Sequence, residues 1–451
     1  MDKTNLNDLQ RLRALLNEKK YTELQQNLSQ MNDYDIALIM ESMEDEDMLK
    51  MFRILGKDKA ADVFSLLETD SQQYIITSLS DKEAGIVIDN LQSDDAADLL
   101  EEMPASIVKK LLENARPDPR KDINHLLQYP EDSAGSVMTV EFVDLKTDMT
   151  VEQAIERIKS ISMDSETINI CYVLDAKRKL MGTCALRYLL LNNNDVLIGD
   201  IMHENVISCD TAMDQEDAAK LFQKYDLTAL PVVDHENRMV GIITIDDIMD
   251  VMQKETTEDI EKMAAIIPTD KAYLKTTVFE TWKKRFPWLM LLMLSATFTG
   301  AIISNYENAL SRFVVLTSYI PMLMDTGGNA GSQASTEVVR ALSLGQISFK
   351  DFFKVIFKEM RVGILCGITL SAAAFLKCIF IDQDTWIVAS VVCITIICAV
   401  FLSKLCGSML TMAVYKLGFD PAVVASPLLT TVIDALSLLI YFNVASIVLQ
   451  I

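Results

Sequence analysis

The chain has 451 residues, a net charge of −23 at pH 7 and a composition that is 50% hydrophobic. Such acidity argues against nucleic acid as a partner, because phosphate binding needs clustered Lys and Arg. Eight cysteines without a CxxC pair and three scattered histidines predict reduced thiols. They argue against a disulfide framework, a zinc site or a histidine-based catalytic triad.

The charge is unevenly divided along the chain. Residues 1–270 contain 54 Asp and Glu and 27 Lys and Arg, a net −27, whereas residues 271–451 contain 10 and 14, a net +4. We therefore expect an acidic soluble region followed by a membrane region. The acidic surface fits cation binding, although a solvated, solubility-promoting surface explains the same charge. The polar start Met1–Asn5 is not expected to be a signal peptide.

The first part of the chain shows apolar residues at three- and four-residue spacing, which predicts helices. Lys57–Val63 recurs as Ser93–Leu99, 36 residues later, and this period predicts a stack of helix pairs. In the second copy, Asp94 and Asp98 share one helix face. They are either a cap with a solvated acid or half of a cation site. The prolines of Arg116–Arg120 predict a turn or linker.

A second duplication follows between residues 133 and 253. Each copy has a polar-capped helix, an apolar strand ending in Asp175 or Asp234, and a glycine seven residues later. The duplication resembles a tandem CBS-domain pair, with its motif in Ala229–Thr244. By that resemblance, Thr244 would contact a nucleotide phosphate and Asp247 its ribose. The first copy lacks both residues, so a single nucleotide site is implied and ATP binding stays open.

Ile245–Ala265 has no Gly or Pro and predicts one long helix rich in acids. Like charges at three- or four-residue spacing each cost ~0.2–0.5 kcal/mol in a helix. The pairs Asp247/Asp250 and Glu255/Asp259 each add this destabilisation to the predicted helix. The helix is either solvated or held in place only when divalent cations bridge it to other acids.

Five hydrophobic segments follow, at roughly 286–304, 313–344, 362–381, 386–402 and 423–451. The second is broken by polar and glycine residues, and the fourth is expected to extend to Ala413. Basic clusters before the first segment and between the second and third place these loops in the cytoplasm and the C-terminus outside.

Asp434 lies deep inside the last segment, where a lone carboxylate costs ~2.5–3.5 kcal/mol on insertion scales. It either bonds to a neighbouring helix or faces an aqueous path. Nearby hydroxyls and carbonyls freed by prolines are hard ligands that suit Mg²⁺ or Ca²⁺.

The run Asp325–Gln333 in the second segment contains Gly327 and Gly331, a small-residue packing face. Its polar load is too heavy for packing alone.

The runs Gly327–Gln333 and Asp420–Asp434 are similar to two hallmark motifs of the MgtE magnesium channel family, and the resemblance covers essentially the whole chain. It implies a homodimer in the plasma membrane that conducts Mg²⁺ and is closed by cytoplasmic Mg²⁺, with lipid around it. The predicted fold class is multidomain. Its parts are an all-α helical-repeat domain (1–130), α/β CBS domains (131–200 and 201–253), an acidic connecting helix (245–270) and an α-helical pore domain with five transmembrane helices (271–451).

The resemblance also assigns site residues. Those implied to line the pore are Gly328, Asn329, Ser332, Ser426 and Thr430. Those implied to bind Mg²⁺ are Asp434 in the pore and, in the soluble part, Asp62, Asp94, Asp98, Gly135 (through its carbonyl), Glu216, Asp226, Asp247, Asp250, Glu255, Glu258 and Asp259. Ser332 and Ser426 depart from the Asn that the family often has, and a shorter side chain could widen the filter.

Other functions are less favoured by the sequence. A membrane-anchored Mg²⁺ or nucleotide sensor would need neither Asp434 nor a polar second segment. A coupled transporter is disfavoured because the only other ionisable residues noted in the last three segments, Lys377 and Lys404, are expected near segment ends. An enzyme is least favoured, since no nucleophile–base pair or phosphate-cradling loop is present.

Overall fold

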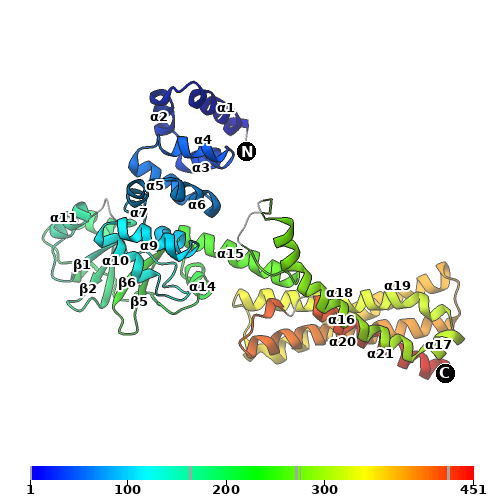
Figure 1. Cartoon of the computed structure of the whole chain (residues 1–451). Helices are drawn as coiled ribbons and strands as arrows, with labels where there is room; N and C mark the ends of the chain where they lie inside the picture. The colour runs from blue at the N-terminus through cyan, green and yellow to red at the C-terminus, as the bar shows by residue number, and fades with distance from the viewer. Residues whose placement is uncertain (1–2, 162–164, 270–272, 275, 424–426, 451) are drawn as a thin grey trace. The chain divides into compact units, whose positions relative to one another are not determined.

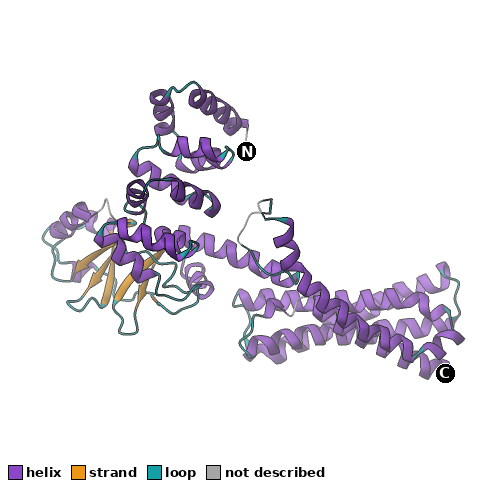
Figure 2. Cartoon of the chain, in the orientation of Figure 1, coloured by secondary structure: helices purple, strands orange, loops and turns teal. Residues whose placement is uncertain are grey.

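The structure is a computed structural model that describes residues 3–161, 165–269, 273–274, 276–423 and 427–450. The chain divides into two compact units, Met1–Met252 and Gln253–Ile451. Among the described residues, strands occur only in the first unit, and the second is helical (Figure 2).

The first unit begins with ten short helices that bury one continuous core, including Leu24, Ile36, Phe64 and Ile88 (Figure 1). The helices are α1 (Lys3–Asn17), α2 (Tyr21–Gln30), α3 (Asp33–Glu41), α4 (Asp45–Phe52), α5 (Lys57–Ser65), α6 (Thr69–Ser78), α7 (Asp81–Ile88), α8 (Ser93–Glu101), α9 (Ala105–Asn114) and α10 (Pro117–Leu126).

The sequence repeat falls on α5 and α8. Ala60 and Val63 are buried in the first copy, and the equivalent Ala96 and Leu99 are buried in the second. The repeated residues therefore encode the same inward-facing helix surface, which confirms the helical repeat. The expected helix pairs are wrong, because α6 and α7 both lie between the two copies and the 36-residue period contains three helices.

The turn or linker expected at Arg116–Arg120 is limited to the short break between α9 and α10, and the expectation is wrong from Pro117 onwards, where α10 begins. Proline is favoured at the first position of a helix, where its missing N–H has no intrahelical partner to lose. The preceding Arg116 N–H donates to Asp89 Oδ1 at 2.7 Å, which fixes the chain before this helix.

The rest of the first unit contains two three-stranded sheets with the same topology. In each sheet the first strand pairs in parallel with the second, and the second pairs antiparallel with the third. The strands are β1 (Phe142–Lys146), β2 (Thr167–Leu174), β3 (Leu180–Ala185), β4 (Cys209–Asp210), β5 (Ala229–Val233) and β6 (Met239–Thr244). The accompanying helices are α11 (Val151–Ile161), α12 (Leu186–Leu191), α13 (Ile198–Ile201) and α14 (Gln215–Tyr225).

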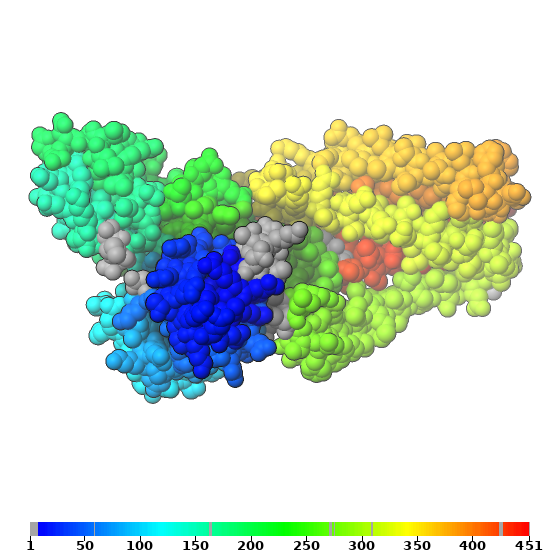
Figure 3. Space-filling view, turned by 90° about the horizontal axis from the view of Figure 1, so that it is seen from above, coloured from blue at the N-terminus to red at the C-terminus, as the bar shows by residue number. Residues whose placement is uncertain are grey.

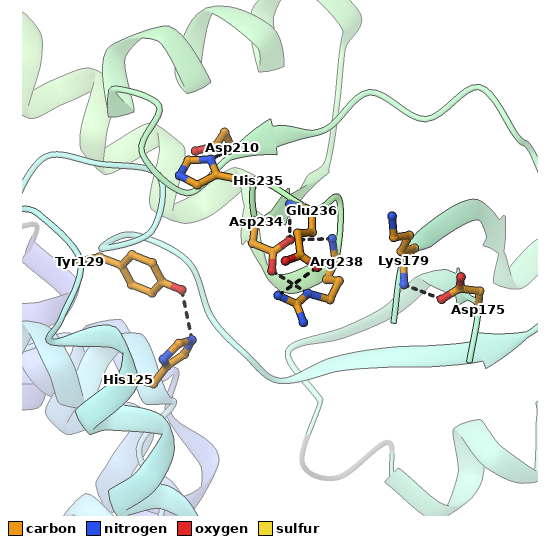
Figure 4. Close-up of polar contacts among 9 residues, drawn as sticks. All are labelled: His125, Tyr129, Asp175, Lys179, Asp210, Asp234, His235, Glu236 and Arg238. Carbon is orange, nitrogen blue, oxygen red and sulfur yellow. Dashed lines mark hydrogen bonds and ion pairs between the residues drawn. The ribbon is translucent and has the colours of Figure 1, made fainter. Parts of the chain in front are cut away.

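The duplicated aspartates have the same role in the two halves. Asp175 Oδ1 accepts from the backbone N–H groups of Lys177 and Lys179, and Asp234 Oδ1 accepts in the same way from Glu236 and Arg238. Figure 4 shows both turns. Each acid thus closes the turn between the second and third strands of its sheet.

The duplicated glycines join the two halves. A Cβ on Gly241 would lie 2.5 Å from the carbonyl oxygen of Thr139, and one on Gly182 would lie 2.9 Å from that of His203. The opening segment of each half therefore packs on the third strand of the other half, and only glycine leaves room for that approach.

The connecting helix is continuous, as predicted, and forms α15 (Ile245–Met263). The boundary between the two compact units falls inside it, after Met252. Ile248 is buried in the core of the second CBS half. Met263 packs in the second unit against Val339 and Ala422.

The second unit is built from α16 (Val278–Asn305), α17 (Glu307–Arg312), α18 (Val315–Ser343), α19 (Phe352–Leu376), α20 (Trp386–Lys416) and α21 (Pro427–Leu449), with short turns η1 (Phe349–Asp351), η2 (Lys377–Ile381) and η3 (Pro421–Val423). In the described residues, four stretches are long and apolar enough to cross a membrane: α16, η1 to η2, α20 and α21.

The fifth long helix, α18, has 29 residues and stays continuous through its glycines and polar residues. Neighbouring helices on both sides support it, which a hydropathy pattern does not reveal. The predicted fold class is confirmed in its three parts: a helical N-terminal domain, a CBS pair and a C-terminal helical membrane domain.

Candidate functional site

The intramembrane carboxylate of Asp434 lies on α21 against the glycine face of α18. Asp434 is half-buried, and its Oδ1 is 3.2 Å from the place where a Cβ on Gly328 would lie. Thr430, one turn earlier on α21, has its Cβ 3.6 Å from the same place. The absence of a side chain at Gly328 thus leaves space beside the carboxylate, whereas the Thr430 hydroxyl donates to the carbonyl oxygen of Pro427 at 2.7 Å.

The neighbouring glycines hold α18 between two other helices. A Cβ on Gly331 would lie 2.0 Å from Ile433 Cδ1 of α21 and 3.0 Å from the Ser403 carbonyl oxygen of α20. A Cβ on Gly407 of α20 would lie 2.4 Å from the Gly331 carbonyl oxygen. The glycines therefore have the predicted role in close packing, and Gly328 has a second role that the sequence did not predict, a space next to Asp434.

One face of α18 is polar and uncovered in a single chain. Asp325 and Asn329 are exposed and Ser332 is half-exposed, and their spacing of four and three residues places them on one side of the helix. In the space-filling view, part of the red-coloured α21 is open between yellow and yellow-green segments (Figure 3). Ser426, the remaining residue implied to line a pore, lies outside the described residues.

Asp325 is a second acid at this site that the sequence assignments left out. It interacts electrostatically with Asp434 across the α18–α21 contact. Its position three residues before Gly328 placed it in the motif, but only the helix packing brings it near Asp434. Intramembrane carboxylates facing one polar surface mark a path for cations rather than for anions.

A second acidic site lies inside the first unit, where α8 and the start of α15 come together. Burial and the nearby charge of Asp247 raise the pKa of Asp95 to about 7, and the same causes raise the pKa of Glu166 to about 7. Burial also raises the pKa of Asp247 to about 6, although the Thr244 hydroxyl donates to it. Burial and the Asp247 charge raise the pKa of Asp94 well above its ordinary value.

These acids form what we call the α8–α15 cluster: Asp94, Asp95, Asp98, Glu141, Glu166, Asp246 and Asp247. Glu141 is held in place, since Ser93 Oγ donates to its Oε2 at 2.7 Å and Thr139 Oγ1 donates at 2.5 Å. The sequence singled out Asp94, Asp98 and Asp247. Asp95 and Asp246 are chain neighbours of these residues, whereas Glu141 and Glu166 come from other segments and join the cluster only through the fold.

The remaining predicted acids are at least partly exposed, whereas Gly135 is buried, and its backbone N–H donates to the Thr211 carbonyl oxygen at 2.9 Å. Asp62 is exposed on α5, and Asp226 ends α14 in the left-handed conformation with a φ of 50°. Glu216 pairs with Lys220 Nζ at 3.2 Å. Within the described part of the chain, no three His, Cys, Asp or Glu side chains converge closely enough to hold a bare metal ion. A hydrated Mg²⁺, bound through its waters, needs no such convergence.

The end of α15 has an amino group at its acidic surface. Lys262 Nζ lies 2.6 Å from Glu258 Oε1 and 2.7 Å from Asp420 Oδ2, the acid just before η3. The two carboxylates outweigh burial and raise the pKa of Lys262. The predicted ligand Glu258 is therefore engaged with an ammonium group in this structure.

The predicted nucleotide residues are already in contact. Thr244 is 6% exposed, and its hydroxyl donates to Asp247 Oδ2 at 2.5 Å. Asp247 thus belongs both to the predicted nucleotide site and to the α8–α15 cluster.

The expectation that Lys404 lies near a segment end is wrong. It lies in the interior of α20, is 5% exposed, and its Nζ is 3.9 Å from Oε2 of Glu359 on α19, which is 3% exposed. The sequence pattern missed Glu359 because it stands among the basic residues at the start of α19. By contrast, Lys377 is at the end of its segment, 2.6 Å from Asp382.

The fold and these sites define a multi-pass membrane protein with helical and CBS domains attached to its membrane helices. Comparisons with known proteins agree. Residues 320–444 match the family model MgtE, described as a divalent cation transporter, residues 31–132 match the MgtE intracellular N domain, and residues 198–254 match the CBS domain.

The magnesium transporter MgtE of Thermus thermophilus is 38% identical over 343 residues, which are 76% of this chain and 75% of that protein. The chain therefore belongs to the MgtE family, a family of membrane transporters.

Two solved structures resemble the soluble part. The crystal structure of the soluble part of a magnesium transporter has a TM-score of 0.53 and 31% identity, covering 56% of this chain and 99% of that one. The cytosolic domain of the Mg²⁺ channel MgtE in complex with ATP has a TM-score of 0.51 and 34% identity, covering 53% of this chain and 98% of that one.

Proposed function

We propose that this protein is a homodimeric Mg²⁺ channel of the plasma membrane, lined by α18 and α21 and closed by cytoplasmic Mg²⁺. The observation that carries the proposal is the position of Asp434, half-buried beside the bare backbone of Gly328 and next to a polar helix face that a single chain leaves open. A second copy facing that surface would pair two Asp434 carboxylates around one path.

Mg²⁺ dehydrates reluctantly and keeps several of its waters when it binds. Two facing carboxylates would accept hydrogen bonds from these waters and neutralise the divalent charge. The hydroxyls of Thr430 and Ser332 and the amide of Asn329 would bond to the same waters. A hydrated ion would thus be held by charge and by water-mediated bonds, weakly enough to leave again.

Mg²⁺ flux into proteoliposomes tests the pore. Asp434→Asn keeps the side-chain size but removes the fixed charge, and we expect it to abolish flux while the protein still assembles. Glu337→Gln is the matched control, because Glu337 also lies on α18 but is a surface residue, 66% exposed and paired with Lys358. Wild-type flux in Asp434→Asn would overturn the assignment of the pore.

The α8–α15 cluster supports the gating part of the proposal. Its acids repel one another when charged, so Mg²⁺ would stabilise the contact between α8 and α15. α15 continues as one helix to Lys262 and Met263, which belong to the second unit, where Lys262 pairs with Asp420 and Met263 packs against Val339 and Ala422. We propose that bound Mg²⁺ holds this helix in the closed state.

A two-state gate needs ~5.5 kcal/mol of differential binding to move from 1:99 to 99:1. One weak surface site could not supply this, whereas several sites of ~1 kcal/mol each could do so and would give a steep response. The domain boundaries given above, the orientation with a cytoplasmic N-terminus and the remaining Mg²⁺ ligands stay predictions within this scheme.

ATP binding at Thr244 and Asp247 is a further part of the proposal, supported by the likeness to the ATP complex of a relative's cytosolic domain. The shared carboxylate of Asp247 would couple nucleotide and Mg²⁺ binding. Thr244→Val removes the hydroxyl but keeps the carboxylate. Loss of ATP binding with retained Mg²⁺ binding in this variant would separate the two sites, and unchanged ATP affinity would exclude Thr244 as a phosphate contact.

A further inference from the structure

The buried residues of α19 form one stripe. They are Glu359, Gly363, Gly367, Ser371 and Ala374, spaced by four, four, four and three residues. This spacing places them on a single face of the helix. A small-residue stripe with a carboxylate at one end is therefore the surface that α19 presents to the rest of the unit.

The stripe meets α20 in an antiparallel register. A Cβ on Gly363 would lie 3.2 Å from the Cα of Phe401, and one on Gly367 would lie 3.1 Å from the Cα of Ile397. Farther along, Cys393 Sγ donates to the carbonyl oxygen of Ser371 at 3.3 Å. Each step of four residues along α19 moves the partner four residues back along α20.

A repeat of this kind does not define its own register. If α20 slipped by four residues, about 6 Å at 1.5 Å per residue, small residues of α19 would again face α20. Close backbone packing alone therefore leaves registers one turn apart nearly equivalent. An interaction between residues that occur only once on each helix is therefore needed to select one of these registers.

Glu359 and Lys404 occur once on these buried faces. Their side chains are 4% and 7% exposed, their charged atoms are 3.9 Å apart, and Glu359 Oε2 has no hydrogen-bond partner in the described part of the structure. An ion pair so buried and so incompletely bonded adds little to stability compared with apolar side chains. Separating the pair, however, leaves two uncompensated buried charges, which is strongly unfavourable.

We propose that the Glu359–Lys404 ion pair fixes the register of α20 on α19 and thereby positions the glycine face of α18 opposite Asp434. Ser403, next to Lys404, has its carbonyl oxygen 3.0 Å from the place where a Cβ on Gly331 would lie, and Gly407 touches the Gly331 backbone in the same way. A one-turn slip of α20 would remove both contacts. Glu359 and Lys404 are positioning residues, and their effect on conduction rests on the proposed pore.

Disulfide crosslinking of the full-length protein reads the register without using flux. With the other seven native cysteines replaced, Ser371→Cys should crosslink to native Cys393. Slipped registers are reported by Ser371→Cys with Ile397→Cys or Ala389→Cys in a Cys393→Ala background. These reporters are combined with Glu359→Met/Lys404→Met, with the charge swap Glu359→Lys/Lys404→Glu, and with Asp434→Asn.

We expect the double Met variant to insert and to form the slipped crosslinks as well as the original one, with Mg²⁺ flux reduced on the order of tenfold. The charge swap should restore the single register and most of the flux. Asp434→Asn should lose flux but keep the original crosslink, which separates a failed pore assignment from a failed register assignment.

Two results would overturn the proposal. One is a double Met variant with the original crosslink alone and wild-type flux. The other concerns Glu359→Gln, which leaves Lys404 without its buried partner and should be defective in the register and in flux. A charge swap with the same defect would mean that the local surroundings, and not the pairing of the two charges, determine the register. If Mg²⁺ uptake by the wild type followed an imposed pH gradient and Glu359→Gln removed that dependence, the pair would carry protons, and the register role would be rejected.

Discussion

The two acidic sites of this protein use burial in opposite ways. In the membrane unit, Asp434 stands beside the glycines of α18, and the space next to it is kept open by the absence of side chains. In the α8–α15 cluster, acids from distant segments are crowded together, and their burial raises several pKa values to about 6 or 7. A site through which an ion moves needs few charges and room for water. In a site that senses cations, by contrast, carboxylates can be held close together, and bound cations reduce the electrostatic repulsion between them.

The largest expected effect comes from disturbing the close packing of α18 on α20 in the membrane unit. Gly407→Ala would place a Cβ 2.4 Å from the Gly331 carbonyl oxygen, so α18 and α20 would have to separate. Overpacking of this kind costs about 1–3 kcal/mol. We expect a lower midpoint of thermal unfolding in detergent and loss of most Mg²⁺ flux.

Gly300→Ala is the control for that experiment. A Cβ on Gly300 of α16 meets no atom within 4 Å, and alanine favours a helix over glycine by about 0.5–1 kcal/mol. This variant should be as stable as the wild type or more so. If both substitutions had the same small effect, the glycines of α18 and α20 would not be needed for close packing.

Replacing carboxylates of the α8–α15 cluster by amides tests whether repulsion between these acids destabilises the Mg²⁺-free protein. Asp95→Asn combined with Asp247→Asn should stabilise the Mg²⁺-free protein, on the order of 1 kcal/mol or about 2–4 °C in the unfolding midpoint. The same variant should lose Mg²⁺-dependent stabilisation and stay open at high Mg²⁺. Glu46→Gln is the control, since that acid is 86% exposed on α4. A double variant that is less stable without Mg²⁺ would contradict the repulsion.

The pH dependence follows from the raised pKa values. Asp95 and Glu166 have folded-state pKa values of about 7, against about 4 in the unfolded chain. Between these values the folded state binds more protons, so its stability is highest at the acidic end and falls as the pH rises towards 7. We expect this fall in chelator and its suppression by millimolar Mg²⁺, measured by thermal unfolding from pH 5 to pH 8. If Mg²⁺ did not change the slope of the unfolding midpoint against pH, the acids that titrate would not be the ones that bind Mg²⁺.

The smallest effect is expected at Ser332, on the polar face of α18. Ser332→Asn, alone or with Ser426→Asn, should restore a longer hydrogen-bonding arm towards a hydrated ion and sharpen discrimination of Mg²⁺ from Ca²⁺ and Mn²⁺ by less than about tenfold. Competition curves in the flux assay measure it. Asn443→Ser, the reverse exchange farther along α21, should leave them unchanged. Superimposable curves for wild type and Ser332→Asn would show that this position carries no selectivity.

Much of the architecture could be predicted from the sequence, because local patterns encode it. The repeat on α5 and α8, the duplicated strand–Asp–turn–Gly units and the acidic α15 all depend on residues close in the chain. Arg116–Arg120 shows the limit of such reasoning, since the same proline can end one segment or begin a helix.

The sequence by itself determined that Asp434 had to be functional or costly, because a carboxylate in a hydrophobic segment is unfavourable wherever that segment packs. Tertiary structure alone decided which groups surround it. Gly328 and Asp325 reach Asp434 only through the packing of α18 on α21. Likewise, Glu359 meets Lys404 only across the α19–α20 contact. The physical reason is the range of the interactions: helix periodicity and hydropathy are set by neighbours in the chain, whereas burial, charge proximity and helix register depend on residues far away in the chain.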